Sequence, residues 1–282
     1  MSSFDRSGFA SLTDFETKRF KEIFAQLEEE QKLFISAADN FRSSAYVWPW
    51  DALHNWSRVW EYPYVYYHLK DLVDNKSWSK NKKPTVLDLG SGVTFFPFTI
   101  EKLGYNVICV DNDPICVNEL TKAIHHFKKE NNIASKLSDG KSIPIQDDSV
   151  DVLYCISVLE HIENVIPIID EAERVLKSNG IFILTIDIDT RGDSEIGPYK
   201  YEILQKKLFE KFCYFLPNIS THPKNILSTV NSTYPYPGKK TKVAGLLFSL
   251  KQIIKTFLGL KKNFPPPVRL NVEAFILKKF IS

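Results

Sequence analysis

The pattern of hydrophobic positions changes twice along the chain. Residues 1–80 show no strand-like alternation, and apolar positions such as Phe20, Ile23 and Leu27 recur at helical spacing. From residue 84 to about 190, short apolar runs alternate with amphipathic stretches, which predicts strands alternating with helices. After residue 190 the pattern weakens. The chain is therefore expected to begin with a helical segment and to continue as an α/β unit.

The α/β zone has a regular order of predicted elements. Strands are expected at 85–89, 106–110, 133–138, 150–156 and 180–187, and helices near 95–103, 114–130 and 164–177. A further helix over 199–215 and a closing strand over 269–277 follow. This alternation is typical of a doubly wound, mostly parallel sheet with helices on both faces, whose ligand-facing loops lie at the carboxyl ends of the strands.

Changes in composition suggest the domain organisation. The polar linker 74–84 separates an N-terminal helical, aromatic-rich cap over 1–80 from the α/β domain over 81–282. A C-terminal insertion over about 217–265 contains a basic amphipathic segment, 239–262. That segment could touch a membrane surface, but an insertion helix with a solvated lysine face is the favoured interpretation.

Aromatic residues are concentrated between Tyr46 and Tyr67. The favoured interpretation is that these rings fill the core of the helical cap. The alternative is a lid whose rings close over a ligand, with its shape fixed by the prolines in the same stretch.

Composition narrows the class of protein. The 282 residues are 44% hydrophobic and 25% charged, as in an ordinary globular protein, and a net charge of +2 is too small to indicate a nucleic-acid partner. Cys109, Cys116, Cys155 and Cys213 form no C-x-x-C pair, and neither a signal region nor a membrane-length apolar run occurs. We expect a reduced, cytoplasmic protein. The sequence carries no signal for an oligomeric state.

Two loops at predicted strand ends indicate a nucleotide site. The first strand enters the glycine turn Gly90-Ser91-Gly92, and the second strand ends in Asp111. Glycines let backbone N–H groups approach a ligand, and an acid in this place accepts hydrogen bonds from ribose hydroxyls. Thr94 stands where a dinucleotide-binding loop would carry another glycine, which weakens the case for a diphosphate ligand.

The next acidic residues have competing interpretations. Asp113 before Pro114 suits the start of a helix, so Asp111 is the stronger candidate for the ribose. Asp139 and Gly140 close the third strand and could recognise adenine through a carboxylate and a backbone N–H group. Taken alone, these two residues are better explained by a simple Asp-Gly turn.

Two phrases around the fourth strand carry a family resemblance. They are Ile-Pro followed by Asp-Ser-Val-Asp within 143–151, and Val-Leu-Glu-His-Ile at 158–162. With the glycine loop and Asp111, residues 84–190 resemble the class I S-adenosylmethionine-dependent methyltransferases, in their small-molecule, type 11-like branch. The resemblance implies a Rossmann-like sheet of seven strands, with S-adenosyl-L-methionine as cofactor and S-adenosyl-L-homocysteine as product.

The resemblance also implies roles for individual residues. The methionine portion would meet Asp88, Gly90, Ser91 and Gly92, the ribose Asp111 and Asn112, the adenine Asp139 and Gly140, and the amine or sulfonium Ser157. His161 is the candidate catalytic base, with a structural histidine as an equal alternative. Asp187 and Asp189 could bind a divalent metal, but solvated acids are favoured, so no metal is predicted.

The expected activity is methyl transfer to an oxygen or nitrogen of a small molecule, such as a sugar or a natural-product intermediate. The alternatives are an NAD-dependent oxidoreductase and a non-catalytic nucleotide-binding protein of the same fold. Methylation of a nucleic-acid base is disfavoured, because Cys155–Val158 stand where such enzymes carry an Asp/Asn-Pro-Pro-aromatic motif.

Overall fold

The computed structural model of the protein describes residues 4–75, 83–190, 192, 195–234 and 269–280. Most of the predicted insertion, the whole basic segment 239–262 and the predicted domain boundary at residue 80 lie outside the described residues.

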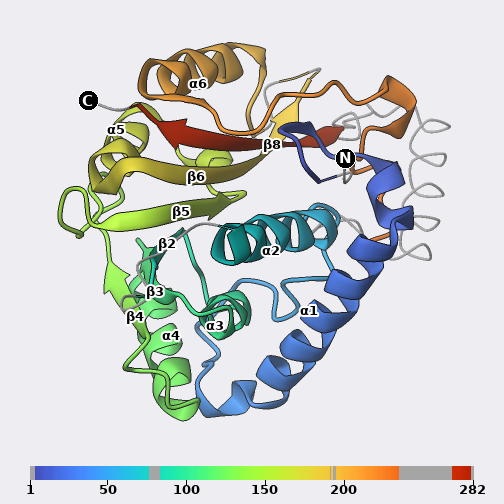
Figure 1. Cartoon of the computed structure of the whole chain (residues 1–282). Coiled ribbons are helices and arrows are strands. Elements are labelled where there is room, and N and C mark those ends of the chain that lie inside the picture. Colours follow the sequence, from blue (N-terminus) through green and yellow to red (C-terminus); the bar gives the residue numbers. More distant parts are fainter. Residues whose placement is uncertain (1–3, 76–82, 191, 193–194, 235–268, 281–282) are drawn as a thin grey trace, which may run out of the picture.

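A central sheet of eight strands organises the molecule (Figure 1). Its spatial order is β1 (Gly8–Phe9), β8 (Leu270–Lys279), β6 (Leu176–Asp189), β5 (Val150–Ile156), β2 (Thr85–Leu89), β3 (Asn106–Asp111) and β4 (Ile133–Leu137), and β7 (Phe212–Tyr214) also pairs with β8. The strands from β4 to β6 are parallel, whereas β8 runs antiparallel to β6. This mostly parallel sheet confirms the predicted α/β class.

Helices cover both faces of the sheet (Figure 1). One face carries α1 (Lys18–Ser36), α2 (Arg58–Asn75), α3 (Phe96–Lys102) and α4 (Pro114–His126), and the other carries α5 (Ile166–Val175) and α6 (Pro198–Lys211). Short 3-10 helices lie at Leu12–Glu16, Ala38–Asn40, Leu159–His161 and Pro223–Asn225. Successive strand residues separate the two cores: Val86 packs under the first group of helices and Leu87 under the second.

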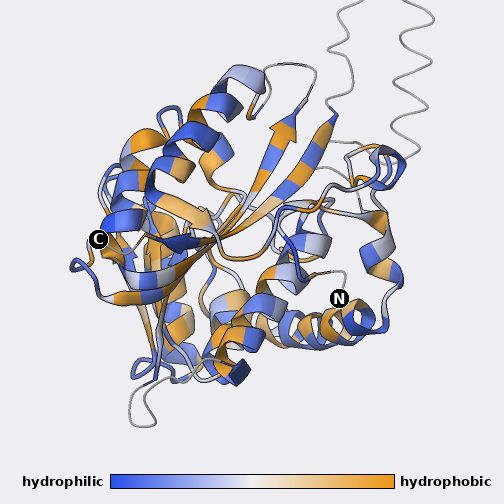
Figure 2. Ribbon diagram, turned by 45° about the horizontal axis from the view of Figure 1, so that its top comes forward, coloured by the Kyte–Doolittle hydropathy of each residue, from blue (hydrophilic) through white to orange (hydrophobic). Residues whose placement is uncertain are grey.

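The spacing of buried residues along a helix explains how the outer helices pack on the sheet. In α5 the buried residues are Ile168, Ile169, Ala172 and Val175, a spacing that makes one apolar stripe facing the sheet. Figure 2 shows hydrophobic and hydrophilic residues alternating along the helices and strands. Within the described residues, no helix combines the length and the apolar character needed to cross a membrane.

The N-terminal segment shares a core with the sheet. Phe34 in α1 packs on Phe98 in α3 with ring centroids 5.4 Å apart, and Tyr62 in α2 packs on Phe96 at 4.7 Å. The segment also supplies β1, whose Gly8 and Phe9 pair with β8. The described sheet has eight strands, one more than the seven predicted, and both strands that the sequence did not locate, β1 and β7, pair with β8.

Candidate active site

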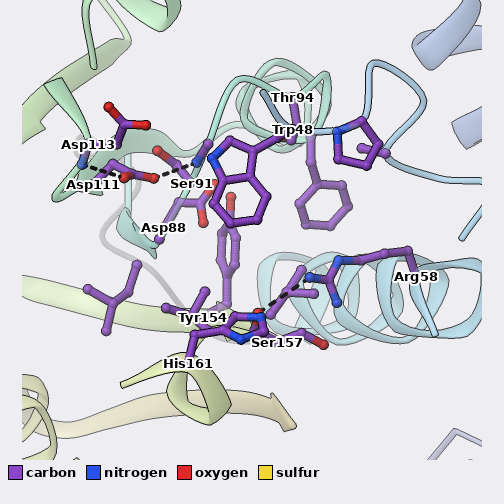
Figure 3. A pocket seen from close by; sticks show the side chains of 18 of the residues that line it. Trp48, Arg58, Asp88, Ser91, Thr94, Asp111, Asp113, Tyr154, Ser157 and His161 are labelled. Carbon is purple, nitrogen blue, oxygen red and sulfur yellow. Dashed lines mark hydrogen bonds between the residues drawn. The ribbon is translucent and has the colours of Figure 1, made fainter. Parts of the chain in front are cut away.

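A cavity of about 470 Å³ lies at the carboxyl ends of the parallel strands. The loops after β2, β3, β4 and β5 form one wall, and the segment 46–58 forms the other. A volume of this size suits a small-molecule site. Figure 3 shows Asp88, Ser91 and Asp111 at one end, Arg58, Ser157 and His161 at the other, and Trp48 between them.

The glycine turn is fitted closely to its surroundings. Gly90 has a φ of +77°, and a Cβ there would lie 2.4 Å from Cγ2 of Val158. The Gly90 N–H donates to the carbonyl of Val110 at 2.8 Å, and the Gly92 N–H donates to Oδ2 of Asp111 at 2.8 Å. Glycine is needed at position 90 because only glycine combines this backbone with the close approach of Val158.

Asp111 and Asp113 have different tasks. The Asp111 carboxylate accepts from Gly92 and, through Oδ1, from the Asp113 N–H at 2.9 Å, and it lines the cavity. Burial raises the pKa of Asp111, although these amides oppose the shift. Asp113 accepts from the Ile115 N–H at 2.8 Å and caps α4, as its sequence context predicted.

The cavity end formed by the glycine turn and Asp111 is acidic, which suits a ligand that donates hydrogen bonds and carries no phosphate. Asp88, Asp111 and Asp113 line it, and Arg58, at the opposite end, is the single Arg or Lys among the described lining residues. Burial raises the pKa of Asp88 to about 8. The buried Ser91 hydroxyl has no hydrogen-bond partner among the described residues. These groups fit the amine and hydroxyl donors of S-adenosylmethionine, and the described lining of this end offers a diphosphate no arginine or lysine.

Asp139 and Gly140, the two residues predicted to bind adenine, lie in different environments. Gly140 lines the cavity together with Asn112 and Ser138. Asp139 is exposed, and its Oδ1 accepts from the N–H groups of Lys141 and Ser142 at 2.9 and 2.7 Å. The structure thus brings Gly140 to the cavity wall, whereas the Asp139 carboxylate belongs to its own turn.

A buried polar cluster forms the floor of the other end. Ser157, at the end of β5 with a φ of +45°, donates from Oγ to Oε1 of Glu61 at 2.7 Å. Arg58 donates to Oε2 of Glu61 at 2.6 Å, and burial leaves Glu61 fully enclosed. Sequence reasoning missed Arg58 and Glu61, because the only signal is an Arg and a Glu three residues apart in a helix, a pair common on any helix.

His161 is brought to this end by the 3-10 turn after β5. Its Nδ1 lies 3.1 Å from Oε2 of Glu195, and its side chain remains 54% exposed. The hydrogen bond to Glu195 raises the pKa of His161. Both residues line the cavity, so the histidine has an orienting carboxylate as well as access to a ligand.

Asp187 and Asp189, the two acids considered as metal ligands, lie in different environments. Asp187 lines the cavity, whereas Asp189 accepts from the Gly192 N–H at 3.0 Å. Within the described residues, no group of three or more His, Cys, Asp or Glu side chains is arranged to hold a metal ion.

The rings of the aromatic segment fill the core, as the favoured interpretation predicted, and some of them also line the cavity. Trp60 and Tyr64 are fully buried in the core and stack at 4.5 Å. Tyr46, Trp48 and Trp56 of the preceding loop line the cavity, as does Tyr62 of α2. Tyr46, Trp56 and Tyr62 are also buried in the core, whereas Trp48 is half exposed.

Comparison with known proteins supports this geometry. A family model described as "Methyltransferase domain" matches residues 87–184, the part of the chain that forms the glycine loop and the strands behind it. Residues 87–184 therefore match a class I S-adenosylmethionine-dependent methyltransferase domain. S-adenosylmethionine is the methyl donor of this family, and the domain has the predicted Rossmann-like fold.

Curated relatives match this methyltransferase domain only in part. An uncharacterized methyltransferase of Mycolicibacterium vanbaalenii is 29% identical over 133 residues, which are 46% of this chain and 51% of that protein. An uncharacterized protein of Methanocaldococcus jannaschii is 34% identical over 98 residues, 35% of this chain and 46% of that protein. The chain spans about half the length of the curated relatives it matches.

Solved structures share the fold of the methyltransferase domain and its surroundings. The [4+2]-cyclase SpnF has a TM-score of 0.52 at 14% identity, covering 91% of this chain and 96% of that one. Geranyl diphosphate C-methyltransferase of Streptomyces coelicolor, solved with Mg²⁺, geranyl diphosphate and S-adenosylhomocysteine, has a TM-score of 0.51 at 11% identity, covering 89% and 98%.

Proposed function

We propose that the protein transfers the methyl group of S-adenosylmethionine to an oxygen or nitrogen atom of a small molecule. One observation carries this proposal: the glycine loop with Asp111 and the His161–Glu195 pair line opposite ends of a single cavity. The methyl donor supplies an activated leaving group, so the protein has mainly to position two molecules and accept a proton.

The cofactor residues are proposed as follows. Asp88, Gly90, Ser91 and Gly92 hold the methionine portion, Asp111 and Asn112 the ribose, Gly140 with Asp139 the adenine, and Ser157 lies near the amine or sulfonium. Asp111 is the best supported, because two backbone amides fix its carboxylate at the cavity wall. Asp139 is the least supported, because its carboxylate faces its own turn.

His161 is proposed as the base that removes a proton from the acceptor. Its ring needs a neutral nitrogen for this, and Glu195 holds Nδ1 so that Nε2 is left for the acceptor. Magnesium is not part of the proposal. A cytoplasmic location, like the small size of the acceptor, stays a prediction.

Two alternatives are weaker on electrostatic and chemical grounds. An NAD-dependent oxidoreductase would place a diphosphate beside three aspartates, at a cavity end where no described lining residue is lysine or arginine. A non-catalytic nucleotide-binding protein would have no use for the His161–Glu195 pair. Because a cyclase also has this fold, fold alone does not establish methyl transfer.

Titration calorimetry tests the proposal directly. We expect S-adenosylhomocysteine to bind with micromolar affinity and NADH to give no heat of binding. Release of S-adenosylhomocysteine from S-adenosylmethionine in the presence of an acceptor mixture is the second readout. Binding of NADH without binding of S-adenosylhomocysteine would overturn the proposal.

A further inference from the structure

The end of the cavity lined by Arg58, Ser157, His161 and Glu195 is here called the acceptor end. It also contains a buried acid with one oxygen that accepts no hydrogen bond from the described residues. Asp187, at the end of β6, is 8% exposed and lines the cavity. Its Oδ1 has no hydrogen-bond partner among the described residues. A buried carboxylate oxygen left without a donor costs free energy, so a ligand group that donates there would be bound preferentially.

Among the described residues, no cationic side chain forms a salt bridge with Asp187, because the nearby positive groups have other partners. Arg58 pairs with Glu61 at 2.6 Å, and His161 pairs with Glu195 at 3.1 Å. Each of the two cationic side chains that line this end is therefore paired with a glutamate.

Glu160 adds to the surplus of acid beside Asp187. Its Oε1 accepts from the Asp187 N–H at 3.3 Å, and its Oε2 has no partner among the described residues. Lys200 donates to the backbone carbonyl of Glu160 at 2.8 Å, and no salt bridge within 4 Å joins it to either carboxylate in the described part of the chain. Burial and mutual repulsion raise the pKa of Asp187 and bring that of Glu160 to about 7.

Aromatic rings complete the environment. Trp48 and Trp56 line the same cavity, and the face of an indole attracts a cation. A surplus of buried carboxyl groups at a cavity that indole rings also line complements a positively charged group that donates hydrogen bonds.

We propose that the methyl acceptor carries an amine, and that this amine binds at Oδ1 of Asp187, in the cavity that Trp48 and Trp56 also line. This inference rests on the proposed function, because it places the amine next to a cavity end that S-adenosylmethionine occupies. Asp187 is a specificity residue here. The amine either is methylated itself or positions a nearby hydroxyl or amine toward His161.

The experiment uses the full chain saturated with S-adenosylhomocysteine, so that the cofactor end is filled. Three probes of similar shape are titrated: 2-phenylethylamine, 2-phenylethanol and 3-phenylpropionate, which are cationic, neutral and anionic at pH 7. We expect the amine to bind at least about tenfold more tightly than the alcohol, the scale of one charge-assisted hydrogen bond, and the anion to bind weakest.

Two variants with the same chemical change locate the effect. Asp187→Asn is expected to remove the preference for the amine while leaving the affinity for S-adenosylhomocysteine unchanged, which also shows that it folds. Asp189→Asn, two residues along β6 and turned to Gly192, is expected to keep the preference.

Equal binding of the three probes to the unmodified protein, or an amine preference that survives Asp187→Asn, would overturn the inference. Either result with S-adenosylhomocysteine still bound leaves the proposed function standing. Failure of S-adenosylhomocysteine to bind at all overturns the proposed function, and the inference falls with it.

Discussion

Asp111 and Asp113 show how two residues of one type acquire different roles within three positions. Both carboxylates accept backbone N–H groups, but Asp111 lies at the end of β3, and Asp113 caps α4. Helix capping places the Asp113 side chain over the first turn of the helix, which leaves Asp111 to meet a ligand. Local backbone geometry decides the difference.

Asp111→Asn is expected to weaken the binding of S-adenosylhomocysteine by about ten- to a hundredfold, because an amide loses the charge-assisted hydrogen bonds to ribose. Calorimetry at pH 7 measures this. Asp113→Asn is the matched control, since asparagine also caps a helix, and its affinity should stay within about threefold. Equal losses in the two variants would contradict the role of Asp111.

His161→Ala is expected to lower turnover by about a hundredfold or more while leaving the affinity for S-adenosylhomocysteine intact, as for loss of a general base. Release of S-adenosylhomocysteine gives the rate. Unchanged turnover would remove His161 from the mechanism.

Glu195→Gln probes the same pair by pH. Glu195 raises the pKa of His161, so its loss should move the rising limb of the rate profile to lower pH. If the rising limb of the pH–rate profile lies at the same pH in Glu195→Gln and in the unmodified protein, His161 is not the titrating base.

At the scale of elements, α2 joins the core to the cavity. Its first turn carries Arg58 and Glu61 to the cavity, and the same helix buries Trp60 and Tyr64 in the core. The Trp60 indole N–H donates to Asp14 at 2.8 Å, and Asp14 also pairs with Arg6 at 3.0 Å. One helix therefore serves both stability and the site.

Trp60→Ala is expected to lower the free energy of unfolding by about 3–5 kcal/mol, the cost of removing a buried aromatic ring. Trp48→Ala, whose side chain is largely exposed, should change it by no more than about 0.5 kcal/mol and instead weaken 2-phenylethylamine binding. Urea denaturation measures the free energy of unfolding of both variants. Similar destabilisation by both variants would contradict the division of the aromatic segment.

Element boundaries were predicted well where a local signal marks them. β2, β5 and the start of α4 agree with the sequence, since glycine, proline and apolar runs mark their ends. The helix expected over 199–215 ends at Lys211, because Phe212–Tyr214 pair with β8. Gly8 and Phe9 became a strand for the same reason: a distant partner supplied the hydrogen bonds.

At the scale of the whole molecule, buried carboxyl groups link stability to pH. Glu273 on β8 is 3% exposed and accepts from the Tyr201 hydroxyl, and burial raises its pKa from 4.5 to about 7. Asp88 follows the same rule, with a pKa of about 8. The folded state therefore holds protons that the unfolded chain would release between pH 4 and 8.

We expect the protein without cofactor to lose stability as pH rises from about 5 to 8, because a carboxyl with a raised pKa stabilises the folded state only while it stays protonated. Thermal unfolding measured across this pH range tests the expected loss of stability. Glu273→Gln keeps a neutral group in place and should flatten the decline toward pH 7. A stability that rises with pH over this window would contradict the role of these acids.

The sequence by itself determined the fold class, the order of the central strands and helices, and the glycine loop with Asp111. These features depend on local geometry: strand and helix periods, turn residues and residues adjacent in the chain. Tertiary structure alone decided the acceptor end, where Arg58, Ser157, His161, Asp187 and Glu195 meet from separate elements. No local pattern records that meeting, because long-range packing of α2 and β6 against β5 creates it, and the same packing turned Asp187 into the cavity and Asp189 away.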